Sequence, residues 1–114
     1  MPRSLQMYLA DLQLSIEAIE EFTQGKSQED FEREKILRSA VRGELVVIGE
    51  AMSQMLHHFP ETGEHVGRAR RIVDFRNLLV HEYGEVDEAI LWSIVIDSLP
   101  ELKIEIQNWI DNSK

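Results

Sequence analysis

Apolar residues recur at three- and four-residue steps along almost the whole chain, which is the spacing of one face of an α-helix. No segment alternates apolar and polar residues with the period of two that a half-buried strand requires. Only three prolines and six glycines interrupt the 114 residues. The pattern therefore predicts an all-α protein in which short breaks separate amphipathic helices.

These breaks define four principal helices. They are expected at residues 4–24, 27–58 with a break near residue 33, 65–82, and 87–110. In the last region, Ser98-Leu99-Pro100-Glu101 has the pattern of a capping box, and Pro100 cannot donate a hydrogen bond to Ile96. We expect a four- to five-helix up-and-down bundle, with the final helix kinked near Pro100.

Length and composition favour one soluble domain that spans residues 1–114. No apolar run approaches the length that crosses a bilayer, and the N-terminus has no secretory leader, so we expect a cytoplasmic protein without a membrane partner. The chain has no cysteine, which excludes disulfides, thiolate chemistry and cysteine-bound zinc.

The formal net charge of −9 argues against indiscriminate binding to nucleic acid. Residues 66–83 nevertheless hold four arginines against two acidic residues, a local balance of +2, so the rest of the chain carries −11. This basic segment could be a focused anion site, or a solvated helix face whose arginines pair with nearby carboxylates. The acidic remainder would also suit a basic partner protein.

Arg76 lies in the middle of an apolar stripe of its predicted helix. At about 100° per residue, Ile72, Val73, Leu79 and Val80 all project within roughly 60° of it. An arginine is costly to desolvate there without a partner, which is a reason to consider an active-site role. The alternatives are an arginine that extends to the rim of the core, or one paired with a carboxylate of a neighbouring helix.

His81 follows five residues later, on a second stripe with Arg70, Asp74 and Asn77, about 140° from Arg76. Imidazole can accept a proton from an attacking hydroxyl, and guanidinium matches the oxygens of a phosphate. Two side chains so far apart on one helix do not easily meet on one phosphate. Either the helix unwinds before His81, or a second copy of the chain completes the site, and we favour the dimer.

Other candidates have weaker patterns. Glu50 follows Gly49, where a glycine permits close approach of another helix, and Glu50 could support Arg76 through a salt bridge. Tyr83, close to the azimuth of Arg76, is a candidate substrate contact or site of covalent modification, or simply an amphipathic residue at a helix end. His57, His58 and His65 lack a convincing ligand spacing, so no metal is expected.

The run Arg76-Asn77-x3-His81-x-Tyr83 resembles the signature of the HEPN superfamily, and most closely its HepT-like toxins. Blocks at residues 7–12, 47–51, 71–77 and 97–102 are similar to HepT-like segments in the same order. The resemblance covers most of the chain. It implies an all-α bundle, generally a homodimer whose motif lines a cleft between the two protomers.

The resemblance further implies the toxin of a toxin–antitoxin pair, a metal-independent endoribonuclease without a cofactor. Arg76 would hold the phosphate, His81 would act as acid and base, and Asn77 would support both, with Arg70, Asp74 and Glu50 as supporting residues. The nucleophile would be a 2′-hydroxyl, so RNA and not DNA would be cut. The implied partner is a nucleotidyltransferase antitoxin that transfers AMP to Tyr83.

Two other hypotheses remain open from the sequence. The chain could be a non-catalytic HEPN module that holds nucleotide or substrate for a nucleotidyltransferase. It could also be a plain helical dimerisation domain, in which neither Arg76 nor His81 matters beyond stability.

Overall fold

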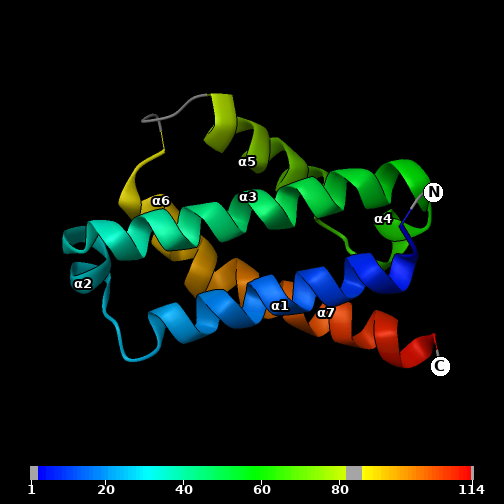
Figure 1. The fold of residues 1–114 in the computed structure, drawn as a ribbon, viewed down its shortest axis with the longest axis horizontal. Helices are drawn as coiled ribbons and strands as arrows, with labels where there is room; N and C mark the ends of the chain where they lie inside the picture. Colours follow the sequence, from blue (N-terminus) through cyan, green and yellow to red (C-terminus); the bar gives the residue numbers. More distant parts are fainter. Residues whose placement is uncertain (1–2, 82–85, 114) are drawn as a thin grey trace.

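The computed structural model describes residues 3–81 and 86–113, and all regular structure in these two ranges is helical (Figure 1). The prediction of an all-α bundle is therefore confirmed. Four helices are long: α1 (Leu5–Thr23), α3 (Lys35–His58), α5 (Ala69–His81) and α7 (Leu99–Asn112). The short segments are α2 (Gln28–Arg33), α4 (Thr62–His65), α6 (Glu88–Ser93) and the π-helical η1 (Ile94–Ser98).

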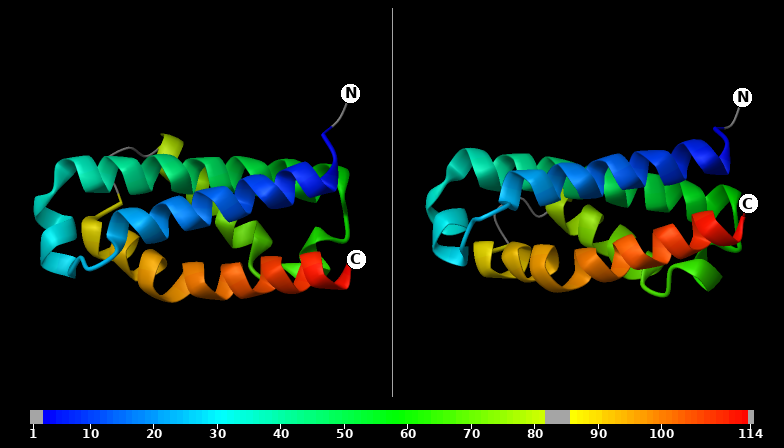
Figure 2. Two further views of the ribbon diagram at one scale, coloured as in Figure 1. Left: turned by 60° about the horizontal axis from the view of Figure 1, so that its bottom comes forward. Right: turned by 90° about the horizontal axis from the view of Figure 1, so that it is seen from below.

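The long helices run up and down and pack side by side. The views of Figure 2 show α1 beside α3, with α6, η1 and α7 forming a nearly continuous rod along the other side of the bundle. Helix α5 returns along α3 in the opposite direction, and its C-terminal end rises away from the bundle (Figure 1). This placement leaves the last turn of α5 at the periphery.

The predicted helix starts and stops are mostly confirmed. The Ser4 hydroxyl accepts a hydrogen bond from the Met7 N–H at the start of α1, and Gly25 after its end has a φ of 74°. Ser27 and Asp30 form a reciprocal capping box at α2, which lowers the pKa of Asp30 because its carboxylate accepts the Ser27 backbone N–H. The carboxylate of Asp87 accepts from the Ile90 N–H at α6.

Two details of the prediction are wrong. The helix expected over residues 65–82 is divided, because α4 ends at His65 and α5 begins only at Ala69. Ser98 is not an N-cap: its backbone is helical and its side chain makes no capping hydrogen bond. The expected irregularity near Pro100 is nevertheless present, as a π-helical turn just before it, in which the Leu99 N–H donates to the Ile94 carbonyl five residues back.

A single cluster of apolar side chains fills the space between the helices. Its fully buried members come from every long helix, and they include Leu12, Ile16, Val41, Met52, Met55, Leu79 and Ile106. Phe31 of α2 is also buried and lies 5.3 Å from the Trp92 ring of α6, measured between ring centres. None of the helices in the described ranges is both long enough and apolar enough to cross a bilayer.

Candidate active site

Helices α3 and α5 cross at Gly49, where the two backbones come unusually close. A Cβ atom at position 49 would overlap the Cβ and Cγ atoms of Arg76 and would stand 3.4 Å from the Ile72 carbonyl oxygen. Only a residue without a side chain leaves room for the stem of Arg76 at this crossing. The predicted close approach at Gly49 is therefore present, and the side chain it admits is Arg76.

The packing at this crossing fixes Arg76 among apolar neighbours. Its side chain is half-buried, and both Val73 and Leu79 on the same stripe are buried. The Arg76 Nε is buried, and within the described residues it has no hydrogen-bond partner and the guanidinium has no ion pair. The Nε of this cation has lost water without gaining a carboxylate, which makes an anionic ligand at the guanidinium favourable.

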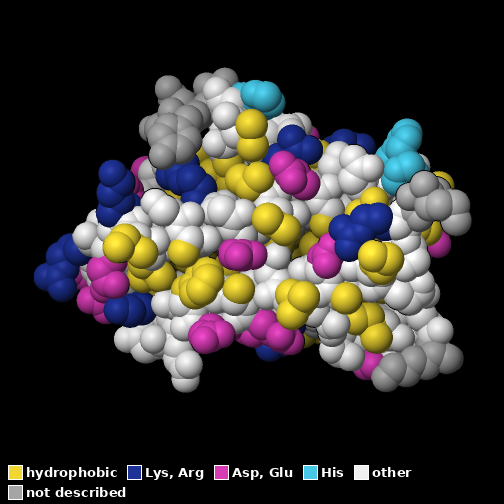
Figure 3. Space-filling view, in the orientation of Figure 1, with side chains coloured by type: hydrophobic (Ala, Val, Ile, Leu, Met, Phe, Trp, Pro, Cys, Tyr) yellow, Lys and Arg dark blue, Asp and Glu magenta, His cyan; other side chains and the backbone are white. Residues whose placement is uncertain are grey.

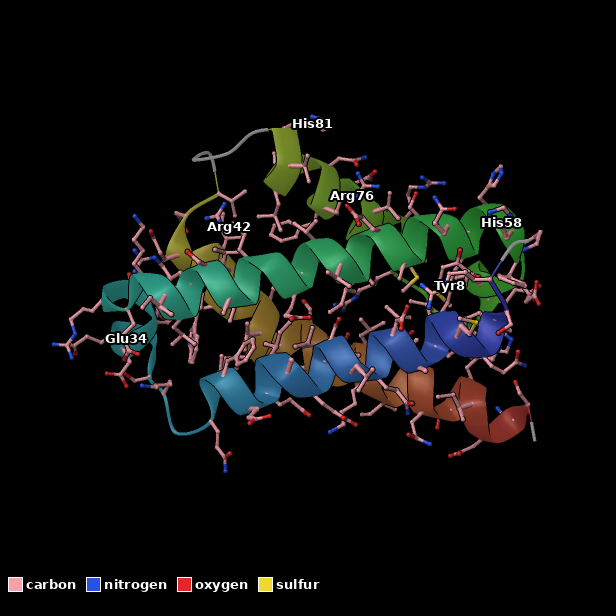
Figure 4. All side chains as sticks on the ribbon, viewed as in Figure 1. Tyr8, Glu34, Arg42, His58, Arg76 and His81 are labelled. Carbon is pink, nitrogen blue, oxygen red and sulfur yellow. The ribbon has the colours of Figure 1, made fainter. Side chains whose placement is uncertain are left out.

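His81 lies at the C-terminal end of α5, and its side chain is exposed. Figure 4 shows Arg76 and His81 on the same side of α3, with His81 at the peripheral end of the helix. Since α5 is continuous from Ala69 to His81, the helix does not unwind between the two residues. Of the two arrangements expected from the sequence, unwinding of the helix before His81 is therefore not observed.

The remaining predicted site residues lie close to this segment in sequence or space. Asn77, Arg70 and Asp74 are exposed on α5, and Glu50 is exposed on α3 next to Gly49. In residues 3–81 and 86–113, none of the four forms an ion pair with Arg76 or His81. Their supporting roles stay predictions. Tyr83, the expected site of modification, lies outside the described residues.

The basic segment is only partly neutralised within the chain. Arg68 pairs with Glu101 of α7 at 3.0 Å, as expected for a solvated helix face. Among the described residues, Arg70, Arg71 and Arg76 make no such pair. Figure 3 shows Lys and Arg side chains along the α5 side of the visible face and also at the α2 end of the molecule, whereas most Asp and Glu side chains lie over α3 and α1. The α5 side therefore carries positive charge that the described part of the chain only partly neutralises.

The three histidines outside the motif contact other aromatic or imidazole rings. The His65 ring stacks on Trp109 of α7, with ring centres 4.3 Å apart and planes 6° from parallel. His57 and His58 contact each other edge to face at the exposed end of α3. Within the described ranges, no three histidine, aspartate or glutamate side chains converge as a metal site would require.

A separate cavity of about 260 Å³ lies on the other side of α5, between this helix, α3 and the η1–α7 rod. Its walls are apolar, with Ile48, Phe75 and Leu102 among them, and its rim carries Arg68 and Arg71. Neither Arg76 nor His81 lines it. This cavity and the sequence motif are therefore different places.

Comparison with known proteins shows which family the chain belongs to. Residues 12–109 match the family described as Ribonuclease HepT-like. The chain belongs to the HepT-like ribonuclease family. The motif of Arg76, Asn77 and His81, on which the resemblance rested, falls inside the matched region. The expected family is confirmed.

Several curated relatives carry names that agree with this family. The "Probable ribonuclease HepT" of Thermococcus cleftensis is 37% identical over 90% of this chain and 93% of its own length. A "Putative RNase" of Methanocaldococcus jannaschii is 32% identical over 92% of this chain and 95% of its own length.

A longer relative from Methanocaldococcus jannaschii is named "Gamma-glutamylcyclotransferase and putative RNase". It is 34% identical over 93% of this chain, which spans only 47% of that protein. No solved structure matches the chain significantly.

One further residue near the motif, Arg42 of α3, is not among the predicted site residues. Its side chain is half-buried, and Figure 4 shows it on the side of α3 that carries Arg76 and His81. The available signal was its position seven residues, or about two turns, before Gly49 on the same helix face.

Proposed function

We propose that this HepT-like protein is a metal-independent endoribonuclease that cuts RNA with Arg76 and His81. The observation that carries the proposal is Arg76, whose stem packs against Gly49 and whose buried Nε has no hydrogen-bond partner among residues 3–81 and 86–113, five residues before an exposed histidine. A fixed guanidinium suits the crowded charge of a phosphate under attack. The names of the relatives support RNA as the substrate.

The chemistry requires one proton acceptor, one proton donor and one cation. An imidazole takes the proton from the 2′-hydroxyl, whose oxygen then attacks the neighbouring phosphorus. The bond from phosphorus to the 5′-oxygen breaks, and that oxygen receives a proton from an imidazolium. The products are a 2′,3′-cyclic phosphate and a 5′-hydroxyl. DNA lacks the nucleophile and is not cut.

The working site is proposed to lie between two copies of the chain. Arg76 and His81 are about 140° apart on the uninterrupted helix α5, so one copy does not easily direct both at one phosphate. A two-fold dimer would bring the Arg76 of each protomer near the His81 of its partner. Val80 beside the motif and Val47 on α3 have 45% and 44% of their surface exposed, and such apolar side chains suit a protein contact.

The biological role proposed is that of a toxin neutralised by a nucleotidyltransferase antitoxin. This part rests on the family motif, in which Tyr83 corresponds to the tyrosine that accepts AMP. The transfer would form a bond from the Tyr83 oxygen to the α-phosphorus of ATP and release pyrophosphate. The added negative phosphodiester and adenosine next to the motif would compete with RNA for the site.

The direct test is cleavage of a fluorescent single-stranded RNA by the purified protein in the presence of EDTA. We expect cleavage of RNA, none of the matching DNA, and a loss of about 100- to 10,000-fold in rate for His81→Ala, the range for a lost general acid–base group. The matched control is His57→Ala, which removes another exposed histidine at the end of α3. Equal activity of His81→Ala and wild type would refute the mechanism.

A further inference from the structure

Arg42 of α3 lies near the motif without belonging to it. We propose that Arg42 binds a second phosphate of the RNA substrate, in addition to the phosphate held by Arg76. This inference rests on the proposed ribonuclease function and assigns to it a substrate contact outside the Arg76–His81 segment.

Arg42 and Gly49 lie on the same face of α3. Arg42 precedes Gly49 by seven residues, so the two project within about 20° of each other and are separated by roughly 10.5 Å along the axis. The stem of Arg76, from α5, packs against α3 at position 49. Arg42 therefore occupies the same face of α3 as the Arg76 stem, two turns closer to the N-terminus of the helix.

The direction of α5 places His81 toward the same end of α3 as Arg42. This helix runs opposite to α3, so its path from Arg76 to His81 leads toward the end of α3 that carries Arg42 (Figures 1 and 4). Along α5 the step from Arg76 to His81 is about 7.5 Å. Arg42 and His81 thus lie on the same side of the crossing point, and Arg76 lies at the crossing itself.

The Arg42 side chain is partly enclosed by its surroundings. The residue is half-buried, and one of its terminal guanidinium nitrogens is buried. A partly enclosed side chain has less conformational freedom to lose when its exposed part binds an anion.

Spacing and charge then indicate which anion is bound. Stacked nucleotides place one phosphate per about 3.4 Å of each strand, so roughly 10 Å between the two arginine positions corresponds to about three nucleotides. The chain carries a net charge of −9, which repels a polyanion elsewhere on its surface. Binding of RNA by such a protein requires local cations in a fixed arrangement, and Arg42 with Arg76 supplies two of them.

The test measures binding of a fluorescent, fully 2′-O-methylated single-stranded RNA, which cannot be cleaved, by anisotropy at several salt concentrations. For Arg42→Gln we expect the slope of log affinity against log salt to fall by about 0.7, the value for one lost phosphate contact on a single strand. Arg71→Gln is the matched control, because it removes an exposed arginine from the other side of α5.

Thermal unfolding checks that each variant is folded. Arg42→Met, which keeps the length of the stem and its apolar contacts, replaces Arg42→Gln if the latter fails to fold. A wild-type slope in the folded Arg42 variant overturns the inference while the ribonuclease proposal stands. If the wild-type protein itself neither binds nor cuts RNA, the proposed function fails, and this inference fails with it.

Discussion

Gly49 leaves the backbone of α3 open at the point where α5 crosses it, and the stem of Arg76 fills the opening. Arg76 is thereby packed like a core residue although its head group is a permanent cation. The helical periodicity predicted its place on the apolar stripe, and Gly49 indicated a close helix contact. The sequence pattern alone does not state that these two residues meet, because that depends on how α3 and α5 are aligned.

Arg76→Lys tests whether the planar guanidinium is needed or only its charge. Lysine is a point charge that cannot bind two phosphate oxygens side by side. We expect kcat/KM for RNA to fall by about 100-fold, the effect typical of losing one donor to the transition state. Arg71→Lys should leave kcat/KM unchanged, since Arg71 faces the cavity on the other side of α5. Full activity of Arg76→Lys would show that only the positive charge of Arg76 is needed and not the planar guanidinium.

Among the elements, the α3–α5 crossing depends most on a single residue. Gly49→Ala would push a methyl group into the Arg76 stem, and we expect it to lower the free energy of unfolding by about 1–3 kcal/mol. Gly43→Ala on the same helix is the control. Nothing lies within 4 Å of its Cβ position, so it should stabilise the protein by about 0.5–1 kcal/mol. Urea unfolding measures both, and equal effects would contradict the tight crossing.

The serines that precede helical segments provide a second comparison. The Ser27 hydroxyl accepts the Asp30 N–H, so Ser27→Ala should lower the free energy of unfolding by about 1 kcal/mol. Ser98 makes no capping hydrogen bond, so Ser98→Ala should change the free energy of unfolding by less than about 0.5 kcal/mol. A cost at Ser98 similar to that at Ser27 would show that α7 begins with a side-chain cap after all.

Local chemistry explains which elements were predictable. Ser4, Ser27, Asp87 and Gly25 act within one turn of their own sequence position, so their patterns indicated the correct helix ends. The sequence around Ser98 satisfies the capping pattern equally well, but the rod formed by α6, η1 and α7 packs along the bundle without a break. Tertiary packing outweighed a local signal there, and the π-helical turn is the result.

At the scale of the whole molecule, the chain is an acidic body with a basic edge along α5. The predicted antitoxin is expected to add negative charge at that edge by modifying Tyr83. After co-expression with a nucleotidyltransferase antitoxin of the proposed kind, the intact mass should increase by one or more AMP groups. Tyr83→Phe should abolish the increase, whereas Tyr8→Phe, which removes the other tyrosine hydroxyl of the chain, should not. An increase that persists in Tyr83→Phe would reject this site.

Much of the candidate site was predictable because most of its residues lie on a single helix, α5. Arg42 was not found, because its relation to the motif depends on the antiparallel return of α5 along α3. The proposed dimer contact likewise depends on surfaces that no pattern within one helix identifies. Val47 and Val80 are exposed only because of how α3 and α5 lie in the fold.

The central claim is that Arg76 of one protomer acts with His81 of its partner. The most direct measurement mixes Arg76→Ala and His81→Ala chains, refolds them together and measures RNA cleavage. Each variant alone should be inactive. If the site is shared, about half of the dimers are mixed and have one intact site of two, so roughly a quarter of wild-type activity should return. No recovery in a mixture shown to contain mixed dimers would contradict the account.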